Sequence, residues 1–147
     1  MNLVILNSLE SLKEFTADTI IDVRAPAEYA DDHLPGAINL PVLDDTQRSE
    51  IGTVYKQNPF TARKNGAALV AFNAANHLQG PLAAKDGGWQ PLIYCWRGGQ
   101  RSGAFATILE QVGWRVQLLE GGYRSYRREV VKAVSYTHLT LPTRIFV

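Results

Sequence analysis

The 147-residue chain has only one cysteine, Cys95, so it can form neither an internal disulfide nor a zinc site made of cysteines alone. Its apolar runs are short: stretches such as 66–72 and 91–96 fall well below the ~18 residues of a membrane-spanning helix. The first residues lack the basic segment that is typical of a secretory signal. We therefore expect no membrane span, a cytoplasmic location and a thiol without a partner cysteine.

The rest of the composition is that of an ordinary folded domain. Hydrophobic residues make up 46% and charged residues 20% of the chain, which excludes disordered, collagen-like and disulfide-dense classes. The net charge of +1 conceals an uneven distribution, since residues 1–50 hold 3 Lys/Arg against 10 Asp/Glu and residues 51–147 hold 12 against 4. This asymmetry indicates either an anionic partner for the basic part or charges that folding interleaves.

Apolar runs alternate with helical patterns along the chain. The runs predict strands at residues 3–6, 19–23, 37–40, 91–95 and 115–119. Helices are predicted between them, one starting at Pro26 and another at Asn58, whose apolar face should contain Leu69, Val70 and Phe72. This alternation predicts an α/β fold with a central, mostly parallel five-stranded sheet flanked by helices.

The end of the chain breaks this pattern. A last helix is predicted from Gly122 to about Ala133, whereas residues 134–147 show neither helical nor strand periodicity. We therefore expect one domain at 1–133. The segment 134–147 is interpreted as an adventitious tail outside that domain.

Cys95 ends a predicted strand and opens a glycine-containing loop that leads into a predicted helix. In open α/β sheets, ligands bind at the carboxyl ends of strands. Two glycines allow the loop amides to turn inward as an anion-binding nest, to which the helix N-terminus adds positive charge. Thiols in such electropositive settings are commonly thiolates at neutral pH. The alternative is that Cys95 is a small buried hydrophobic residue.

This loop is the predicted site. Cys95 is the candidate nucleophile, and Arg97 and Arg101 are expected to add positive charge near its sulfur. The predicted anion-binding and substrate-binding residues are Trp96, Arg97, Gly98, Gly99, Gln100, Arg101 and Ser102. Trp96 is interpreted either as a stacking surface for a nucleobase or as a packing residue.

Two further groups lie outside the loop. Asp22 and Arg24 follow each other closely at the end of a predicted strand, where we expect them to fix the adjacent loop by hydrogen bonds. Basic side chains on the last helix are candidates for contact with RNA phosphates, the alternative being a solvated basic face. They are Arg124, Arg127, Arg128 and Lys132. The histidines show no spacing typical of a metal site, so no metal is expected.

Four motifs in order resemble those of a rhodanese domain. They are DVRAPAEY at 22–29, HLPGAINLP at 33–41, the cysteine loop at 95–102 and EGGY at 120–123. The resemblance implies that family's central parallel sheet and a persulfide or equivalent chalcogen adduct on Cys95. Residues 51–57, 96–102 and 120–128 are most similar to the N-terminal domain of the bacterial tRNA 2-selenouridine synthase family.

The narrower resemblance implies a transferase reaction. Enzymes of that family replace the sulfur of wobble 2-thiouridine in tRNA with selenium from selenophosphate, through an S-geranylated intermediate. It therefore implies tRNA as partner, selenophosphate and geranyl diphosphate as substrates, and no tightly bound cofactor. The family continues into a C-terminal P-loop domain, whose Gly-x-x-x-x-Gly-Lys-Ser/Thr motif this chain lacks. We thus expect a truncated synthase that is weak or inactive in the full reaction.

One departure from the family pattern keeps other activities open. Five residues separate Cys95 from Arg101, one more than in the usual sulfurtransferase loop. This spacing resembles rhodanese-fold phosphatases and arsenate reductases. The alternatives are such an enzyme, a stand-alone thiosulfate-type sulfurtransferase, or a non-catalytic module that binds tRNA or protein.

Overall fold

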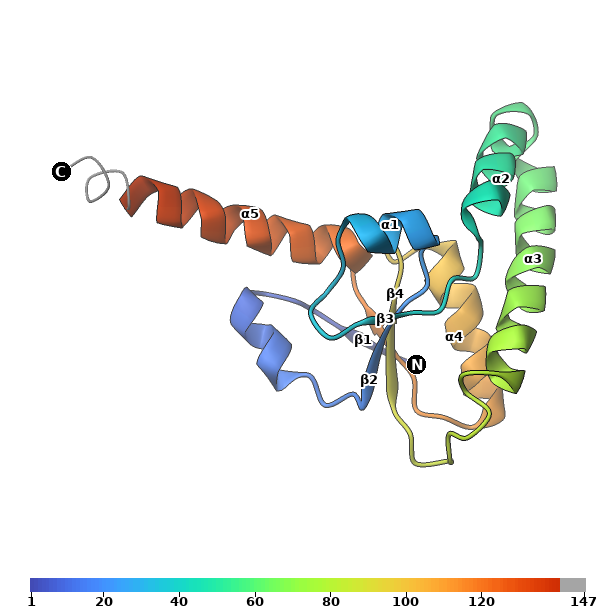
Figure 1. The fold of residues 1–147 in the computed structure, drawn as a ribbon, viewed down its shortest axis with the longest axis horizontal. Coiled ribbons are helices and arrows are strands. Elements are labelled where there is room, and N and C mark those ends of the chain that lie inside the picture. Colours follow the sequence, from blue (N-terminus) through green and yellow to red (C-terminus); the bar gives the residue numbers. More distant parts are fainter. Residues whose placement is uncertain (141–147) are drawn as a thin grey trace.

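A computed structural model describes the backbone of residues 1–140 and the side chains of residues 1–135. Its centre is a five-stranded sheet in which every pair of neighbouring strands is parallel. The strand order is β1–β5–β4–β2–β3, so β4 is the central strand (Figure 1). The predicted α/β class with a five-stranded sheet is confirmed.

The elements follow the predicted order along the chain. The strands are β1 Asn2–Val4, β2 Thr19–Asp22, β3 Ile38–Asn39, β4 Pro91–Tyr94 and β5 Gln117–Leu119. The helices are a 3₁₀ helix, η1 Leu9–Glu14, and α1 Pro26–Asp31, α2 Asp45–Gln57, α3 Pro59–Gln79, α4 Gln100–Val112 and α5 Gly122–Thr140. Each strand is one or two residues shorter than predicted. No helix in the described part of the chain is long and apolar enough to cross a membrane.

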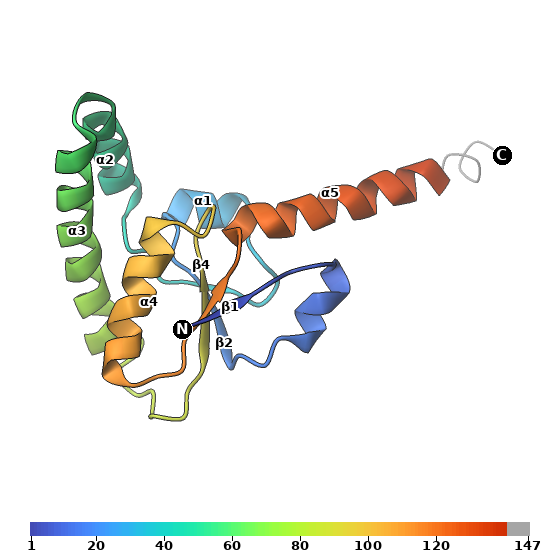
Figure 2. The ribbon, with the colours of Figure 1, turned by 180° about the vertical axis from the view of Figure 1, so that it is seen from behind.

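Helices cover both faces of the sheet, which explains why β4 is apolar throughout. All of β4 is buried, and its side chains alternate between two core clusters. Ile93 packs in the cluster that includes α3 and α4, whereas Leu92 and Tyr94 pack in the cluster that includes η1 and the start of α5. Figures 1 and 2 show α3 and α4 on one side of the sheet and η1 on the other.

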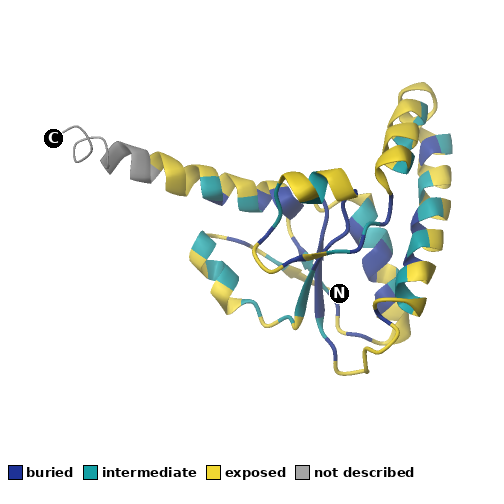
Figure 3. Cartoon of the chain, viewed as in Figure 1, coloured by how far each residue is buried: buried dark blue, intermediate teal, exposed yellow. Residues whose placement is uncertain are grey.

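One predicted core position in α3 is wrong. The helix starts at Pro59, as predicted, with the Asn58 side chain accepting a hydrogen bond from the Thr61 amide at 3.1 Å. Val70 is buried in the core, but Phe72 is 66% exposed. Phe72 lies two residues and thus about 200° around the helix from Val70, so the two side chains cannot both face the sheet. Figure 3 shows the exposed outer surface of this helix.

The predicted end of the last helix is also wrong. Instead of ending near Ala133, α5 continues through Thr140 and projects away from the sheet (Figures 1 and 2). Residues 141–147 of the predicted tail lie outside the described residues. The interpretation of 134–147 as an adventitious tail stays a prediction.

The start of α5 is in direct contact with the loop after β4. The amides of Tyr123 and Arg124 donate hydrogen bonds to the carbonyls of Cys95 at 2.7 Å and of Trp96 at 3.1 Å. Gly122 has a φ of +57°, and a Cβ at this position would overlap the Cys95 carbonyl oxygen. Only glycine allows this close approach, because any side chain here would separate α5 from the loop.

We predict that Gly122→Ala destabilises the fold by about 2 kcal/mol or more, because it combines a left-handed conformation with a backbone overlap. The matched control is Gly103→Ala within α4, where a Cβ would meet nothing within 4 Å. The control should be neutral or stabilising, because alanine favours helices. Urea unfolding measures both changes. Equal effects of the two substitutions would contradict the close packing at Gly122.

Candidate functional site

Cys95 directly follows β4 at the carboxyl edge of the sheet. The residue is 3% exposed, and its Sγ lies 3.0 Å from Oγ of the buried Ser102 in the first turn of α4. The Ser102 hydroxyl is also within hydrogen-bonding distance of the Gly99 carbonyl, at 3.3 Å. Residues 96–100 are all exposed, so the sulfur lies at the floor of a surface loop.

The loop above the sulfur presents unpaired amide groups. Gly98 adopts a φ of +75°, and a Cβ there would lie 3.2 Å from the Gly121 nitrogen. In the described part of the chain, no acceptor receives a hydrogen bond from the backbone amides of residues 97–102. Because these amides precede and begin α4, they can bind an anion as the predicted nest requires.

Arg101 extends from the loop toward α1. Its Nη1 donates to Oε1 of Glu28 at 2.8 Å, and its Nη2 donates to Oε2 at 3.4 Å. The Glu28 carboxylate also accepts a hydrogen bond from the Ala25 amide at 3.0 Å and lies 3.5 Å from Nε of Arg48. Burial acts to raise the pKa of Glu28, but the hydrogen bonds and charge of Arg101 outweigh it and lower the pKa below 4.5. Arg101 thus shares its charge with a carboxylate.

Arg97 lies on a different side of the loop from Arg101. It is exposed and lines a surface hollow together with Gly121, Ser125 and Arg128. The two arginines that the sequence places near the sulfur therefore face different surroundings. Arg97 faces the start of α5, and Arg101 faces α1 and α2.

An apolar cavity lies beside Arg101, between α2, α3 and the start of α4. Its volume is about 110 Å³, and its apolar lining includes Ile51, Tyr55 and Val70. Arg63 and Arg101 are its charged lining residues. The cavity can take a short apolar group whose anionic end would meet these arginines.

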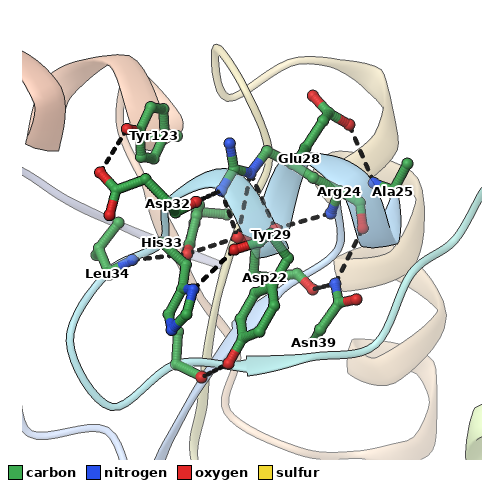
Figure 4. A network of polar contacts seen from close by, with 12 residues as sticks. Asp22, Arg24, Ala25, Glu28, Tyr29, Asp32, His33, Leu34, Asn39 and Tyr123 are labelled. Atoms are coloured by element: carbon green, nitrogen blue, oxygen red, sulfur yellow. Dashed lines mark hydrogen bonds and ion pairs between the residues drawn. The ribbon is translucent and has the colours of Figure 1, made fainter. Parts of the chain in front are cut away.

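A buried ion pair supports the same edge of the sheet (Figure 4). Asp22 and Arg24 are 0% and 1% exposed, and Nη2 of Arg24 donates to Oδ2 of Asp22 at 2.8 Å. The same Nη2 donates to the Asp32 carbonyl at 2.5 Å, and the Tyr94 hydroxyl donates to Asp22 Oδ2 at 2.7 Å. The pair thus makes hydrogen bonds to the following segment, which is the geometry expected from the sequence.

The groups around this pair keep their protons at neutral pH. Burial raises the pKa of Tyr94, and the nearby Asp22 carboxylate raises it further. Burial acts to lower the pKa of Arg24, but the hydrogen bond and charge of Asp22 outweigh it and raise the pKa. Burial and a 2.6 Å hydrogen bond to Asp32 raise the pKa of Tyr123 to about 12. The network is therefore a fixed support and not a source of exchangeable protons.

Three aromatic rings surround the Arg24 guanidinium. Its Cζ lies 4.2 Å from the ring centroid of Tyr123, 5.8 Å from that of Tyr94 and 6.0 Å from that of Trp96. Trp96 and Tyr123 also stack, with centroids 5.4 Å apart and planes inclined by 25°. Cation–π contact with these rings stabilises a desolvated guanidinium.

Sequence reasoning assigned no role to Glu28, and it placed Tyr123 only among the aromatic and basic groups of the last helix that are candidates for phosphate contact. Glu28 lies in the motif at 22–29 and Tyr123 in the motif at 120–123, so membership of these motifs was the only sequence feature that pointed to a role at this site. Their partners, Arg101 and Arg24, are 73 and 99 positions away in the chain. Such contacts become visible only once the chain is folded.

All four predicted RNA-contact residues are exposed on α5. Arg124, Arg127 and Arg128 are exposed, and within the described residues none of them forms an ion pair. Lys132 differs, because its Nζ lies 3.1 Å from a carboxylate oxygen of Glu129. Within the described residues, the basic groups of α5 that have no carboxylate partner are therefore the three arginines.

Comparison with known proteins identifies the family of this chain. The model of the family described as Rhodanese-like domain matches residues 6–129. The curated tRNA 2-selenouridine synthase of Nitrosomonas europaea is 39% identical over 123 residues, covering 82% of this chain and 32% of the relative. The corresponding protein of Bdellovibrio bacteriovorus is 36% identical, covering 78% of this chain and 31% of the relative. The chain thus spans about a third of the length of these relatives.

Solved structures share the fold. The N-terminal domain of a protein named as an ATP/GTP binding protein of Clostridium difficile 630 is 34% identical, with a TM-score of 0.73, covering 88% of this chain and 98% of that one. A rhodanese-related protein of Thermoplasma volcanium is 20% identical, with a TM-score of 0.54, covering 88% of this chain and 93% of that one. The second likeness concerns the fold alone.

We predict that Glu28→Gln destabilises the fold by about 1 to 3 kcal/mol at neutral pH, because Arg101 loses its charged partner. The folded-state pKa of Glu28 lies below 4.5, so its carboxylate contributes fully to the stability of the fold above that pH. This contribution is lost as the pH falls through the folded-state pKa. In urea unfolding, the difference in free energy of unfolding between the wild type and the variant should therefore be smaller at about pH 3.5 than at about pH 7.

The matched control is Glu14→Gln, since Glu14 is exposed and forms no ion pair within the described residues. It should change stability by less than about 0.5 kcal/mol at either pH. A Glu28→Gln effect that is as small as the control, or that does not depend on pH, would contradict the assigned ion pair.

Proposed function

Because the chain belongs to the rhodanese-like domain family, we propose that it is the chalcogen-transfer domain of a tRNA 2-selenouridine synthase. In this proposal Cys95 is the nucleophile and carries sulfur or selenium, and the enzyme replaces the sulfur of wobble 2-thiouridine with selenium. The observation that carries the proposal is the position of the Cys95 sulfur, at the floor of a loop whose amides at 97–102 have no acceptor in the described structure.

The free amides support selenophosphate as the chalcogen donor. Backbone amides that converge at a helix N-terminus bind phosphate-like anions without any side-chain charge. An anion bound there would meet the Cys95 sulfur at the base of the same loop. Ser102, 3.0 Å from that sulfur, would orient the thiol or stabilise the thiolate through its hydroxyl.

The apolar cavity beside Arg101 supports geranyl diphosphate as a second substrate. A volume of about 110 Å³ accommodates part of a prenyl chain, and Arg63 and Arg101 would face the diphosphate. The tRNA partner is supported by Arg124, Arg127 and Arg128, whose charges are available for phosphates.

Cys95→Ser tests the proposed nucleophile. Attack of the wild-type thiolate on thiosulfate breaks the S–S bond, leaves a persulfide on Cys95 and releases sulfite. Intact-mass spectrometry should show one added sulfur after reaction with thiosulfate, and the adduct must lie on the only cysteine of the chain. Cys95→Ser should form no adduct while keeping the wild-type circular dichroism spectrum.

Wild-type protein alkylated with iodoacetamide is the matched control and should also form no adduct. An adduct that persists in Cys95→Ser, or its absence from the wild type with thiosulfate, would contradict the proposal. Hydrolysis of an aryl phosphate as the sole activity would instead identify a rhodanese-fold phosphatase.

A further inference from the structure

We propose that the exposed face of Trp96 is a stacking site for a nucleobase of single-stranded RNA that α5 holds by its phosphates. This inference rests on the proposed function, because it specifies how the RNA would be held next to Cys95. Trp96 is the residue that follows Cys95, so a base stacked on its ring lies at the entrance to the loop.

The Trp96 ring is held in place from its inner side. Tyr123 stacks against it at 5.4 Å, and the Arg24 guanidinium lies 6.0 Å from its centroid. Tyr123 and Arg24 are 6% and 1% exposed, so both are fixed within the fold. A ring that is already ordered loses little conformational freedom when a ligand stacks on it.

The exposure of Trp96 distinguishes it from a packing residue. Trp96 is 39% exposed, whereas Trp89 and Trp114 are each 6% exposed and contact each other edge to face in the core. Because the buried neighbours of Trp96 occupy its inner side, the exposed part of the ring faces solvent. An ordered, solvent-facing indole is a platform of the kind on which single-stranded nucleic acids stack.

Arginines lie on the segments next to this ring, in the loop after Cys95 and in the first turns of α5. The Trp96 carbonyl accepts a hydrogen bond from the Arg124 amide, so the first turn of α5, which carries Arg124, is joined to the backbone of Trp96. Arg97 follows Trp96 in the chain and lines a hollow with Arg128, so two arginines and one carboxylate residue, Glu120, line this hollow. Within the described residues none of these arginines is in an ion pair, which leaves them available to phosphates on either side of a stacked base.

The stacking site favours RNA over an acidic peptide, because phosphates and planar bases alternate along a single strand. Arginines alone would bind either polyanion, whereas a fixed aromatic ring among them adds affinity only for a ligand with exposed bases. Uracil-type bases stack on tryptophan without any hydrogen-bond pattern, so we expect weak sequence preference at this position.

Fluorescence of the full 147-residue chain tests the site. Titration with an oligouridylate of about eight nucleotides should quench the exposed Trp96, while the two buried tryptophans give a constant background. Inorganic polyphosphate of similar charge supplies the phosphates without the bases and should not quench. Trp96→Ala should weaken oligouridylate binding about tenfold or more, and Trp96→Phe should restore most of it.

Replacing Arg124 and Arg128 with glutamine is the matched control. This variant should bind more weakly with a reduced salt dependence, yet its Trp96 fluorescence should still be quenched at saturation. Equal binding by Trp96→Ala and wild type would overturn the stacking site, as would equal quenching by polyphosphate or no binding of oligouridylate to the wild type. None of these results touches the Cys95 adduct, so failure of the stacking site and failure of the proposed chemistry are distinguishable.

Discussion

The Arg24 guanidinium is the interaction on which the site depends. It joins the end of β2 through Asp22, the segment after α1 through the Asp32 carbonyl, and the rings of Tyr94, Trp96 and Tyr123. Arg24 is 1% exposed, and a charge buried this deeply is tolerated only where it has an ion-pair partner and hydrogen bonds. Asp22 is its ion-pair partner, and Asp22 and the Asp32 carbonyl accept its hydrogen bonds. The segments that meet around it are the ones that surround Cys95.

This arrangement explains how motifs from separate parts of the sequence meet at one site. Parallel strands bring their carboxyl ends to one edge, so β2 and β4 deliver Arg24 and Cys95 to the same region. The close approach at Gly122 then places Tyr123 against Arg24 and fixes the start of α5 on the cysteine loop. Glu28 adds a second clamp by holding Arg101. The loop amides can remain unpaired because side chains and α5, and not the amides themselves, keep the loop in position.

The sequence predicted those features that depend on neighbouring residues. Periodicity located the five strands, and the change from strand to glycine loop to helix located Cys95 at a sheet edge. Contacts between residues far apart in the chain could not be predicted from the sequence. The partner of Arg101 and the stack of Trp96 on Tyr123 are therefore known only from the folded structure. Phe72 was misplaced because an apolar residue in a helix does not by itself reveal which side faces the sheet. The extension of α5 to Thr140 was missed because weak periodicity does not exclude a helix.

Hydrogen exchange in an Asp22→Asn/Arg24→Met variant tests the central role of Arg24 most directly. Replacing both partners avoids leaving one buried charge unpaired, so the variant should fold. The account predicts that the amides of Tyr123 and Arg124, which donate to the Cys95 and Trp96 carbonyls, lose protection by about tenfold or more relative to amides within α3. Unchanged protection at Tyr123 and Arg124, or an equal loss throughout α3, would contradict it.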